Sequence, residues 1–384
     1  MLELDRSLEF DAARGADFFS ALPPLPAVVL IEPRETMAEP FLIRAADLRR
    51  RLERLLGPPD PSAKRLNLRE FARAVRYRLT GSRFEQAFAY YQHAKRLFPR
   101  RYQELARLRP PALLKVNLAN AYPRCYVTRR IRTDEATGAP AGGLYYGPFA
   151  SRRAADAFAE KFLDLFKIRR CQIKIRRDPS FPGCIYSEMK MCLAPCFAGC
   201  TKQDYDAEVL RVVGFLGTCG SSLTAEIEKE REAASGSLDF ERAASLHRRL
   251  DKVGDILRGL PEIARRIEDL NAVILQRAAE GQTIAVFTVR AGRIAEPFFL
   301  RFAEFASEPR SVEEILRAQL ESPAEPCPPA RQDLGEHLAL LSRWYYSKPR
   351  DGEIFYRQRD WPYRRILRAC SRLLAPREER EKKG

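Results

Sequence analysis

Long apolar runs are missing from this sequence of 384 residues. No stretch of about 18 apolar residues occurs, the length that a membrane-spanning helix needs. The opening residues, MLELDRSLEF, are too acidic and too weakly apolar for a signal peptide. We therefore expect a cytoplasmic protein without a membrane partner. The 45% of hydrophobic residues still suffices for buried cores and for two or three domains.

Acidic residues are outnumbered by basic ones, 51 to 67, which gives a formal net charge of +16. A field of this sign attracts polyanions, and DNA or another nucleic acid is the partner that it favours. The alternative is an arginine-rich composition whose charge is spread over solvated helix faces. An acidic membrane surface fits less well, because no polybasic run adjoins an apolar anchor.

Apolar periodicity predicts an α+β protein of several domains, the first a small mixed α/β domain over 26–131. Residues 1–25 carry little pattern and are expected to form an extension. Two helices are expected in the first domain, one ending before Gly57 and one that is capped by Ser82 and ends before Pro99. Its expected strands lie at 27–32, 41–43, 75–79, 113–118 and 124–131.

The rest of the chain is expected to form a cysteine segment over 140–202, a helical region over 203–262 and an α+β region over 263–384. The break SGSLD (235–239) predicts an antiparallel helical hairpin. Ala291-Gly292 predicts a β-hairpin, followed by helices at 311–320 and 332–344. A proline-rich loop at 321–329 and a frayed tail at 377–384 complete it. For the aromatic residues near the end we favour a core role over base stacking; they are Trp344, Tyr345, Tyr346 and Trp361.

Cysteine, in contrast, is plentiful: the chain has nine, three of them within MKMCLAPCFAGC (189–200). Cytoplasmic thiols stay reduced, and reduced thiols that cluster usually bind metal. One site fits four of them in the pattern C-x12-C-x7-C-x3-C, namely Cys171, Cys184, Cys192 and Cys196.

Four thiolates satisfy either a tetrahedral zinc ion or an iron–sulfur cluster. No pair here has the C-x2-C spacing that zinc sites usually use, and the wider spans favour the larger cluster, with zinc as the alternative. Cys200 ranks as a spare or packed thiol. The isolated cysteines are expected in core or loop positions; they are Cys125, Cys219, Cys327 and Cys370.

Three segments carry a family resemblance: LYYGPFAS (144–151), LFKIRRC (165–171) and CIYSEMKMCLAPC (184–196). They resemble the UvrC family of bacterial excision-repair nucleases, including its short Cho-type members. The resemblance implies that the four cysteines hold a [4Fe-4S] cluster and that the protein acts on DNA in nucleotide excision repair. The chain is too short to carry the RNase H-like and helix-hairpin-helix domains of the long members as well.

SLDFERAASLHRRLDKV (237–253) is similar to the UVR motif, a helical hairpin by which such proteins dock onto UvrB. His247-Arg248 departs from the Arg-Asp pair of the motif. The alternative is an ordinary amphipathic helix. VRAGRIAEPFF (289–299) resembles the strand pair that follows this hairpin in the family. The residues that match the motif, and so would contact the partner, are Phe240, Glu241, Ala243, Ala244 and Leu246.

By position, the first domain corresponds to the GIY-YIG nuclease of the family. That fold uses tyrosines, an arginine, a lysine and a glutamate that holds Mg²⁺ or Mn²⁺. Alignment places Val29 and Phe41 at the tyrosines, and Tyr90 at the glutamate. Ile43 stands at a signature glycine, and Glu85 lies about a turn and a half from the glutamate position. The remnants are Arg44, at the lysine position, and Arg51, at the arginine position.

Loss of the tyrosines and the carboxylate together predicts a nuclease that no longer cuts. A divalent cation is expected only if activity persists. Three functions remain open: a non-catalytic DNA-binding repair protein, an active structure-specific endonuclease, and a zinc-stabilised nucleic-acid-binding module. A basic surface with either a phosphate-binding or a merely solvated role is predicted at Arg44, Arg49, Arg50 and Arg51.

Overall fold

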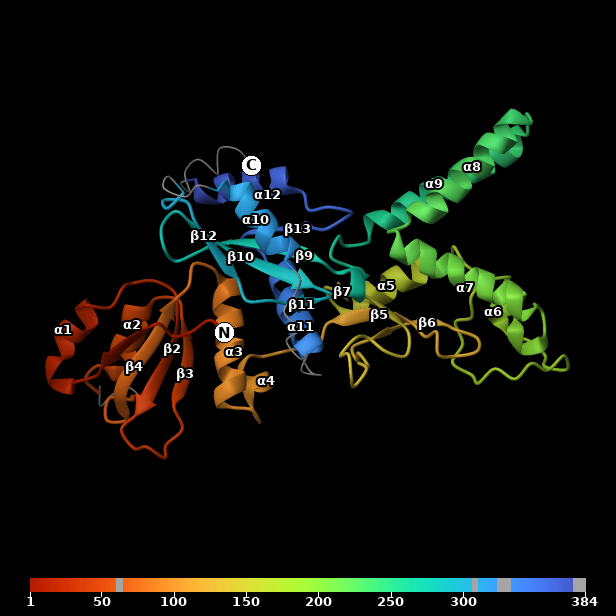
Figure 1. The fold of residues 1–384 in the computed structure, drawn as a ribbon. Coiled ribbons are helices and arrows are strands. Elements are labelled where there is room, and N and C mark those ends of the chain that lie inside the picture. Colours follow the sequence, from red (N-terminus) through yellow and green to blue (C-terminus); the bar gives the residue numbers. More distant parts are fainter. Residues whose placement is uncertain (60–64, 306–309, 323–332, 376–384) are drawn as a thin grey trace.

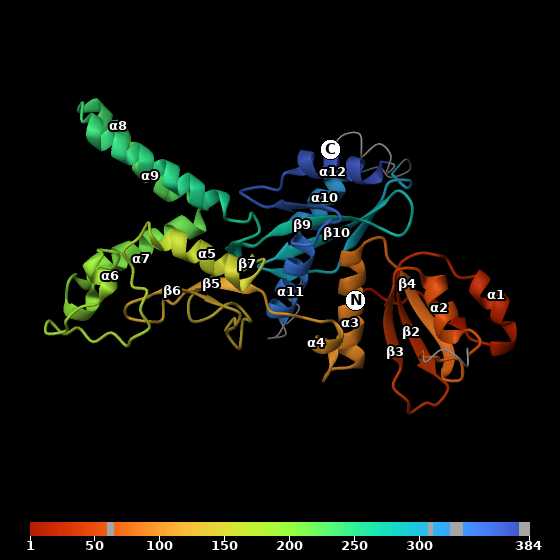
Figure 2. The same ribbon diagram turned by 180° about the vertical axis from the view of Figure 1, so that it is seen from behind.

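The structure is a computed structural model that describes residues 1–59, 65–305, 310–322 and 333–375. Figure 1 shows an elongated arrangement of sheets and helices, and Figure 2 shows it from behind. The described residues form three antiparallel sheets with helices around them, which confirms the α+β class. Within these ranges, no helix is both long and apolar enough to cross a membrane. Cys327 and the expected tail at 377–384 lie outside the described residues, as does nearly all of the expected loop at 321–329.

The first sheet has the strand order β1-β4-β2-β3. The expected boundary at residue 25 does not hold for this sheet, because β1 pairs with β4 as an edge strand. The short, mostly exposed sequence of β1 gives no periodic signal of its own. The other three strands lie where the sequence predicts them. The strands are β1 (Arg6–Glu9), β2 (Ala27–Pro33), β3 (Phe41–Ala45) and β4 (Ala72–Leu79).

Two helices, α1 (Gly15–Ser20) and α2 (Leu48–Leu56), accompany this sheet. Asp47 begins α2, because its carboxylate accepts a hydrogen bond of 3.0 Å from the Arg50 amide. The leucines of α2 pack onto one face of the sheet in a core of their own.

Helix α3 (Arg83–Leu97) lies between the first and third sheets, as both ribbon views show. Ser82 caps it as predicted, accepting a hydrogen bond of 3.0 Å from the Glu85 amide. On the far side, the ring centroid of Phe84 lies 4.9 Å from that of Phe287. The short helix α4 (Tyr102–Leu105) follows. The core around α3 therefore joins residues from both ends of the chain.

The second sheet, of order β6-β5-β7-β8, corrects the expected domain boundary. The strands expected at 113–118 and 124–131 pair with a later strand rather than with the first sheet: Leu114 lies opposite both Val127 and Tyr146. Strand β5 is buried along its whole length, so its pattern fits any interior sheet and does not reveal its partner. The strands are β5 (Ala112–Val116), β6 (Cys125–Thr128), β7 (Leu144–Phe149) and β8 (Arg265–Arg266).

Helix α5 (Arg152–Leu163) covers the second sheet through a stack of phenylalanines, in which the Phe162 and Phe215 ring centroids are 5.9 Å apart. The cysteine segment comes next, with α6 (Ile185–Glu188) and the 3-10 turn η2 (Pro195–Phe197). Three longer helices follow, and the expected hairpin of the last two is confirmed; it projects from the rest of the molecule (Figure 1). They are α7 (Lys202–Gly217), α8 (Ser221–Gly236) and α9 (Phe240–Arg258).

The third sheet has the order β11-β10-β9-β13, with β12 also paired to β10, and the hairpin at Ala291-Gly292 is confirmed. Alternate residues of β9 face opposite cores: Ile274 packs toward α11 and α3, and Val273 toward α12. The strands are β9 (Ala272–Arg277), β10 (Thr283–Arg290), β11 (Arg293–Ile294), β12 (Phe298–Arg301) and β13 (Glu353–Tyr356). The helices are α10 (Val312–Glu321), α11 (Asp333–Tyr345) and α12 (Tyr363–Leu374).

Candidate functional site

The cysteine segment has little regular structure. Between residues 167 and 201, which are described throughout, the regular elements are α6 and η2. Backbone hydrogen bonds of 2.9 Å, from Leu193 to the Lys167 carbonyl and from Asp178 to the Cys196 carbonyl, tie the segment together. Few apolar side chains in it are buried. Hydrophobic packing alone therefore contributes little to the stability of this segment.

The structure places the four predicted cysteines near one another, and all four are free thiols. Burial raises the pKa of the Cys192 thiol to about 11; the Ala194 amide lowers it, and the thiols of Cys171, Cys184 and Cys196 raise it further. Burial also raises the pKa of Cys196, and Cys184 and Cys171 add to the rise. These mutual effects place the four thiols within electrostatic reach of one another.

The backbone beside these thiols is strained. Lys190, Ala194 and Ala198 have φ angles of 56°, 56° and 62°, a left-handed conformation that costs an ordinary residue about 1 kcal/mol. The Ala194 amide donates a hydrogen bond of 3.3 Å to Cys192 Sγ. Such turns fit a segment shaped to present thiolates.

Within the described part of the chain, no group of three or more His, Cys, Asp or Glu side chains is arranged to hold a metal ion. Ligation would therefore require the four thiols to turn toward a shared centre. The remaining described cysteines take no part: Cys200 packs beside the second core, Cys125 and Cys370 are buried, and Cys219 is exposed.

The positions aligned with the nuclease residues do not meet in one place. Val29 is fully buried in the core under α2, and Phe41 packs against the same core. Tyr90 belongs to the core around α3, on the opposite face of the first sheet. Side chains alternate between the faces of a strand, so Val28 faces α3 while Val29 faces α2. These positions therefore do not form a shared site.

Arg44 and Tyr90 do come together. The Arg44 guanidinium lies over the Tyr90 ring, 5.1 Å from its centroid. Gln86 fixes this contact, because its amide nitrogen donates hydrogen bonds to the carbonyls of Ala45 (2.7 Å) and Ala27 (3.0 Å) and so ties α3 to β3 and β2. Tyr90 follows Gln86 by one helical turn and shares its side of the helix.

The arginines of α2 have different environments. Arg49 donates hydrogen bonds to the carbonyls of Leu22 (2.8 Å) and Ser20 (3.0 Å), so its guanidinium is used to anchor the segment after α1. Arg50 is exposed. Burial, then the charge of Arg54, lowers the pKa of Arg51. The expected basic surface at Arg44, Arg49, Arg50 and Arg51 is therefore not a single continuous one.

Glu85, the carboxylate nearest to the aligned glutamate position, faces away from Tyr90. It lines a cleft of about 530 Å³ between the first and third sheets, together with Arg78 and Phe299. Burial raises the pKa of Glu85 to about 7, although the Gly81 amide (2.9 Å) and Arg78 both lower it. No divalent-cation site is formed there, since the described residues hold no suitable ligand group.

The raised pKa of Glu85 makes stability depend on pH. The folded carboxyl keeps its proton up to a pH of about 7, whereas the unfolded carboxyl loses it near the ordinary glutamate pKa of 4.5. The free energy of unfolding should therefore fall as pH rises through this window, by up to about 3 kcal/mol. Glu85→Gln should abolish most of this fall. Urea unfolding at several pH values measures it, and the exposed Glu70→Gln is the control. An unchanged pH profile would contradict the assignment.

The residues that match the UVR motif divide between two environments. Leu246 is buried against the rest of the hairpin, and Ala243 packs at the margin of that core. Phe240, Glu241 and Ala244 are exposed. The predicted shared apolar face is thus only partly used within the chain. At the tip, Leu238 and Phe240 leave 71% and 69% of their surface exposed.

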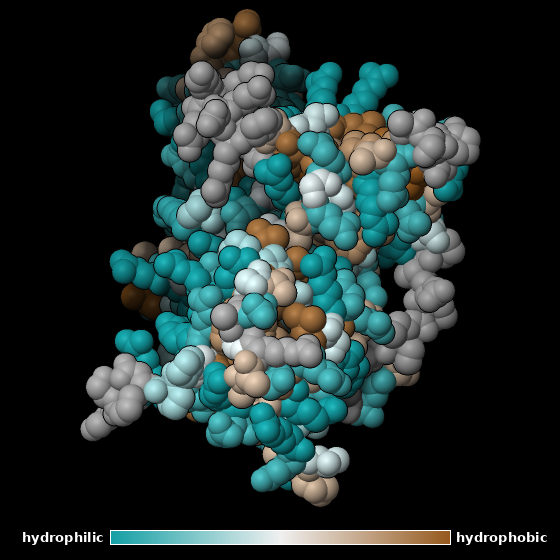
Figure 3. All heavy atoms as spheres, turned by 90° about the vertical axis from the view of Figure 1, so that its left-hand side faces the viewer, coloured by the Kyte–Doolittle hydropathy of each residue, from teal (hydrophilic) through white to brown (hydrophobic). Residues whose placement is uncertain are grey.

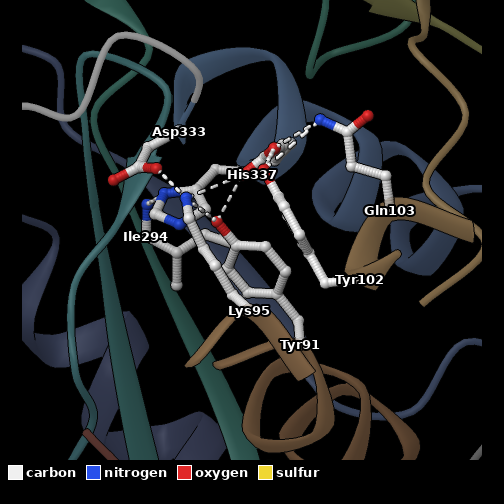
Figure 4. Close-up of polar contacts among 8 residues, drawn as sticks. Tyr91, Lys95, Tyr102, Gln103, Ile294, Asp333 and His337 are labelled. Carbon is white, nitrogen blue, oxygen red and sulfur yellow. Dashed lines mark hydrogen bonds and ion pairs between the residues drawn. The ribbon is translucent and has the colours of Figure 1, made fainter. Parts of the chain in front are cut away.

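A network of buried hydrogen bonds surrounds Glu336, and the sequence did not predict it. Its carboxylate accepts hydrogen bonds from the Tyr91 hydroxyl (2.6 Å), Lys95 Nζ (2.9 Å), Gln103 Nε2 (2.9 Å) and the Tyr102 hydroxyl. Figure 4 shows these side chains of α3 and α4 reaching toward α11. The spacing of Tyr91 and Lys95 along one helix face was the available signal, but an acidic partner more than 200 residues away cannot be found from spacing.

Nearby groups are structural. Burial lowers the pKa of His337 to about 4, and its Nδ1 accepts a hydrogen bond of 3.0 Å from the Ile294 amide, so the ring is neutral. Trp344 and Trp361 are buried, which confirms the core role for the tryptophans. Tyr346 donates a hydrogen bond of 2.9 Å to the Pro148 carbonyl.

The cysteine segment lies in a part of the chain that is similar to a known protein family. Residues 112–215, from the start of β5 into α7, match the UvrC/Cho excinuclease middle domain. The chain is 29% identical to the UvrABC system protein C of Ruminiclostridium cellulolyticum over 182 residues, 47% of this chain and 28% of the relative. It is 26% identical to that of Dehalococcoides mccartyi over 277 residues, 72% of this chain and 44% of the relative.

It is also 25% identical to the UvrABC system protein C of Carboxydothermus hydrogenoformans over 329 residues, 82% of this chain and 52% of the relative. The chain thus spans about half or less of the length of the curated relatives it matches. No solved structure matches. The fold and the cysteine segment define a multidomain α+β protein with a UvrC/Cho middle domain. These likenesses support a protein of the UvrC/Cho type.

Proposed function

We propose that this chain is a cytoplasmic, UvrC-like DNA-binding protein of nucleotide excision repair whose amino-terminal domain has lost its nuclease chemistry. One observation carries this proposal: the aligned catalytic positions are apolar or aromatic, and they lie on opposite faces of the first sheet. Without a hydroxyl at Val29 or Phe41, and with a tyrosine at position 90, neither the nucleophile nor a hard cation ligand is in place. The net charge of +16 supports DNA as the partner.

For the middle domain, we propose a [4Fe-4S] cluster held by Cys171, Cys184, Cys192 and Cys196, with zinc as the alternative. Four free thiols that act on one another, strained turns beside two of them and an N–H···S hydrogen bond support it. When bound, the cluster would supply a cross-link between parts of a segment that buries little apolar surface. The chain's own contribution is the four thiolates and the amide that points at Cys192.

For the projecting hairpin, we propose a UvrB-like docking partner. Exposed apolar side chains at the end of a long hairpin are costly unless a partner covers them, and Leu238 and Phe240 are of this kind. The likeness of residues 237–253 to the UVR motif supports the same partner. His247 and Arg248 replace the usual Arg-Asp pair, so weaker docking than in the family is expected.

Duplex binding and nicking test the proposed function. The full chain should bind a DNA duplex of about 20 base pairs with an affinity that falls steeply between about 50 and 200 mM salt. It should leave the duplex uncut with Mg²⁺ or Mn²⁺. Nicking that is abolished by Arg51→Ala would instead establish an active endonuclease. Absence of binding at low salt would refute the proposal, and metal analysis of the same preparation separates iron from zinc.

A further inference from the structure

Three arginines from separate elements lie near one another, and the first of them lies over the Tyr90 ring: Arg44 in β3, Arg107 after α4 and Arg343 in α11. Burial raises the pKa of the Tyr90 hydroxyl, and both Arg44 and Arg107 lower it. Partial burial lowers the pKa of Arg343, and Arg44 and Arg107 lower it further. Each guanidinium thus lies within electrostatic reach of the others, and all three side chains are exposed.

The fold fixes each arginine in place. Gln86 holds the strand of Arg44 against α3, as described above. Arg343 Nη1 donates a hydrogen bond of 2.9 Å to the Ala106 carbonyl, next to Arg107. Arg343 also follows Glu336 by seven residues, or about two helical turns, so the Glu336 network directs the same face of α11 toward α3 and α4. These contacts prevent the three charges from moving apart freely.

Nothing in the described part of the chain neutralises this group. Besides burial, the groups that shift the pKa of Arg44 are Tyr90 and Arg107, and those that shift the pKa of Arg343 are Arg44 and Arg107; neither set contains a carboxylate. Tyr90 is only 6% exposed, and its hydroxyl, which still reaches solvent, has no hydrogen-bond partner among the described residues. The three guanidinium groups repel one another, and a bound anion would offset this repulsion and accept a hydrogen bond from the Tyr90 hydroxyl.

The backbone at Arg107 adds a second unfavourable feature. Arg107 ends α4 with a φ of 51°, in the left-handed region that glycine usually occupies at such a helix end. An arginine there costs about 1 kcal/mol relative to a relaxed backbone.

We propose that Arg44, Arg107, Arg343 and the Tyr90 hydroxyl form a binding site for one phosphate of the DNA backbone, at the junction of the first sheet and α11. This site rests on the proposed DNA binding and specifies where it occurs. Guanidinium groups suit it because each presents paired N–H donors to phosphate oxygens, and the Tyr90 O–H donates one more hydrogen bond. A phosphate contact positions the duplex without reading its sequence.

Salt-dependent binding of a duplex of about 20 base pairs tests this site in the full chain. The triple variant of Arg44→Gln, Arg107→Gln and Arg343→Gln removes the whole site, so it should lower the slope of log affinity against log salt by about 1 and the affinity by on the order of 10-fold near 100 mM salt. Each single variant should produce part of this loss. Arg343→Lys should keep the slope and lose only a few-fold in affinity, because a point charge replaces the paired donors.

The matched control removes the same charge from the projecting hairpin, with Arg242→Gln, Arg248→Gln and Lys252→Gln together; its slope should stay near that of the wild type. A triple variant of the site that behaves like this control would overturn the inference and leave the proposed function standing. A wild-type chain that binds no duplex at low salt would refute both. A lower melting temperature of the Gln variants with an unchanged slope would show a purely structural role, and the Lys variant keeps the test decisive if a Gln variant fails to fold.

Discussion

Cys192→Ala is expected to release the bound metal and to unfold the cysteine segment while the third sheet stays folded. Ligation of a structural metal contributes on the order of 10 kcal/mol to the folding of such segments, and residues 167–201 have little packing to replace it. The brown colour and visible absorbance of anaerobically purified protein should disappear. Limited proteolysis should then cut within the segment.

Cys219→Ala is the matched control for this experiment, because Cys219 is an exposed, isolated thiol. It should keep the full metal content and the protease resistance of the wild type. Zinc in the wild type, with loss of it in Cys192→Ala, would select zinc over the cluster. Equal metal content and equal protease resistance in all three proteins would remove the ligand assignment altogether.

Glu336→Ala is expected to destabilise the junction of α3, α4 and α11 by about 3 to 5 kcal/mol. Burial raises the pKa of Glu336, but hydrogen bonds from Tyr102, Tyr91, Gln103 and Lys95 outweigh burial and leave it lowered. Without the carboxylate, buried hydroxyls lose their acceptor and Lys95 keeps Asp333 as its one anionic partner among the described residues. The midpoint of urea unfolding measures the change.

Because the folded pKa of Glu336 is lowered, its contribution is present at neutral pH and is lost as pH falls through the folded pKa. The wild type and Glu336→Ala should therefore converge in stability under acid conditions. Glu336→Gln should lose less, since its amide oxygen still accepts a hydrogen bond. Glu313→Ala, an exposed change on α10, should stay within about 0.5 kcal/mol of the wild type. A loss that small for Glu336→Ala as well would contradict the role of the network.

Local chemistry made much of the fold predictable. The Ser82 cap, the turn at Ala291-Gly292 and the apolar runs of β2 and β3 each act over a few residues, and each element lies where these signals place it. Pairings over long distances were not predictable. Strand β5 is buried along its whole length and mostly apolar, so its sequence is compatible with any interior sheet, and its partner β7 lies past a long loop.

The candidate sites divide in the same way. The four cysteines lie close together in sequence, and the structure keeps their thiols within electrostatic reach of one another, but their assignment as ligands stays a prediction. The aligned nuclease positions do not come together in the fold. Side chains one residue apart along a strand face opposite sides of the sheet, and Val29 lies on the side away from Tyr90. Arg107 and Arg343 join Arg44 only through the packing of α3, α4 and α11, and no sequence pattern connects them.

Helix α3 packs between the first and third sheets, and its core contains residues from both ends of the chain. A single core contains Leu2, Phe88 and Tyr356, so a bend between the first and third sheets would disrupt the packing of that core. Both should turn as one rigid body in solution. The protruding α8–α9 hairpin contacts the rest of the molecule at its base, so it is the part expected to move most freely relative to this body.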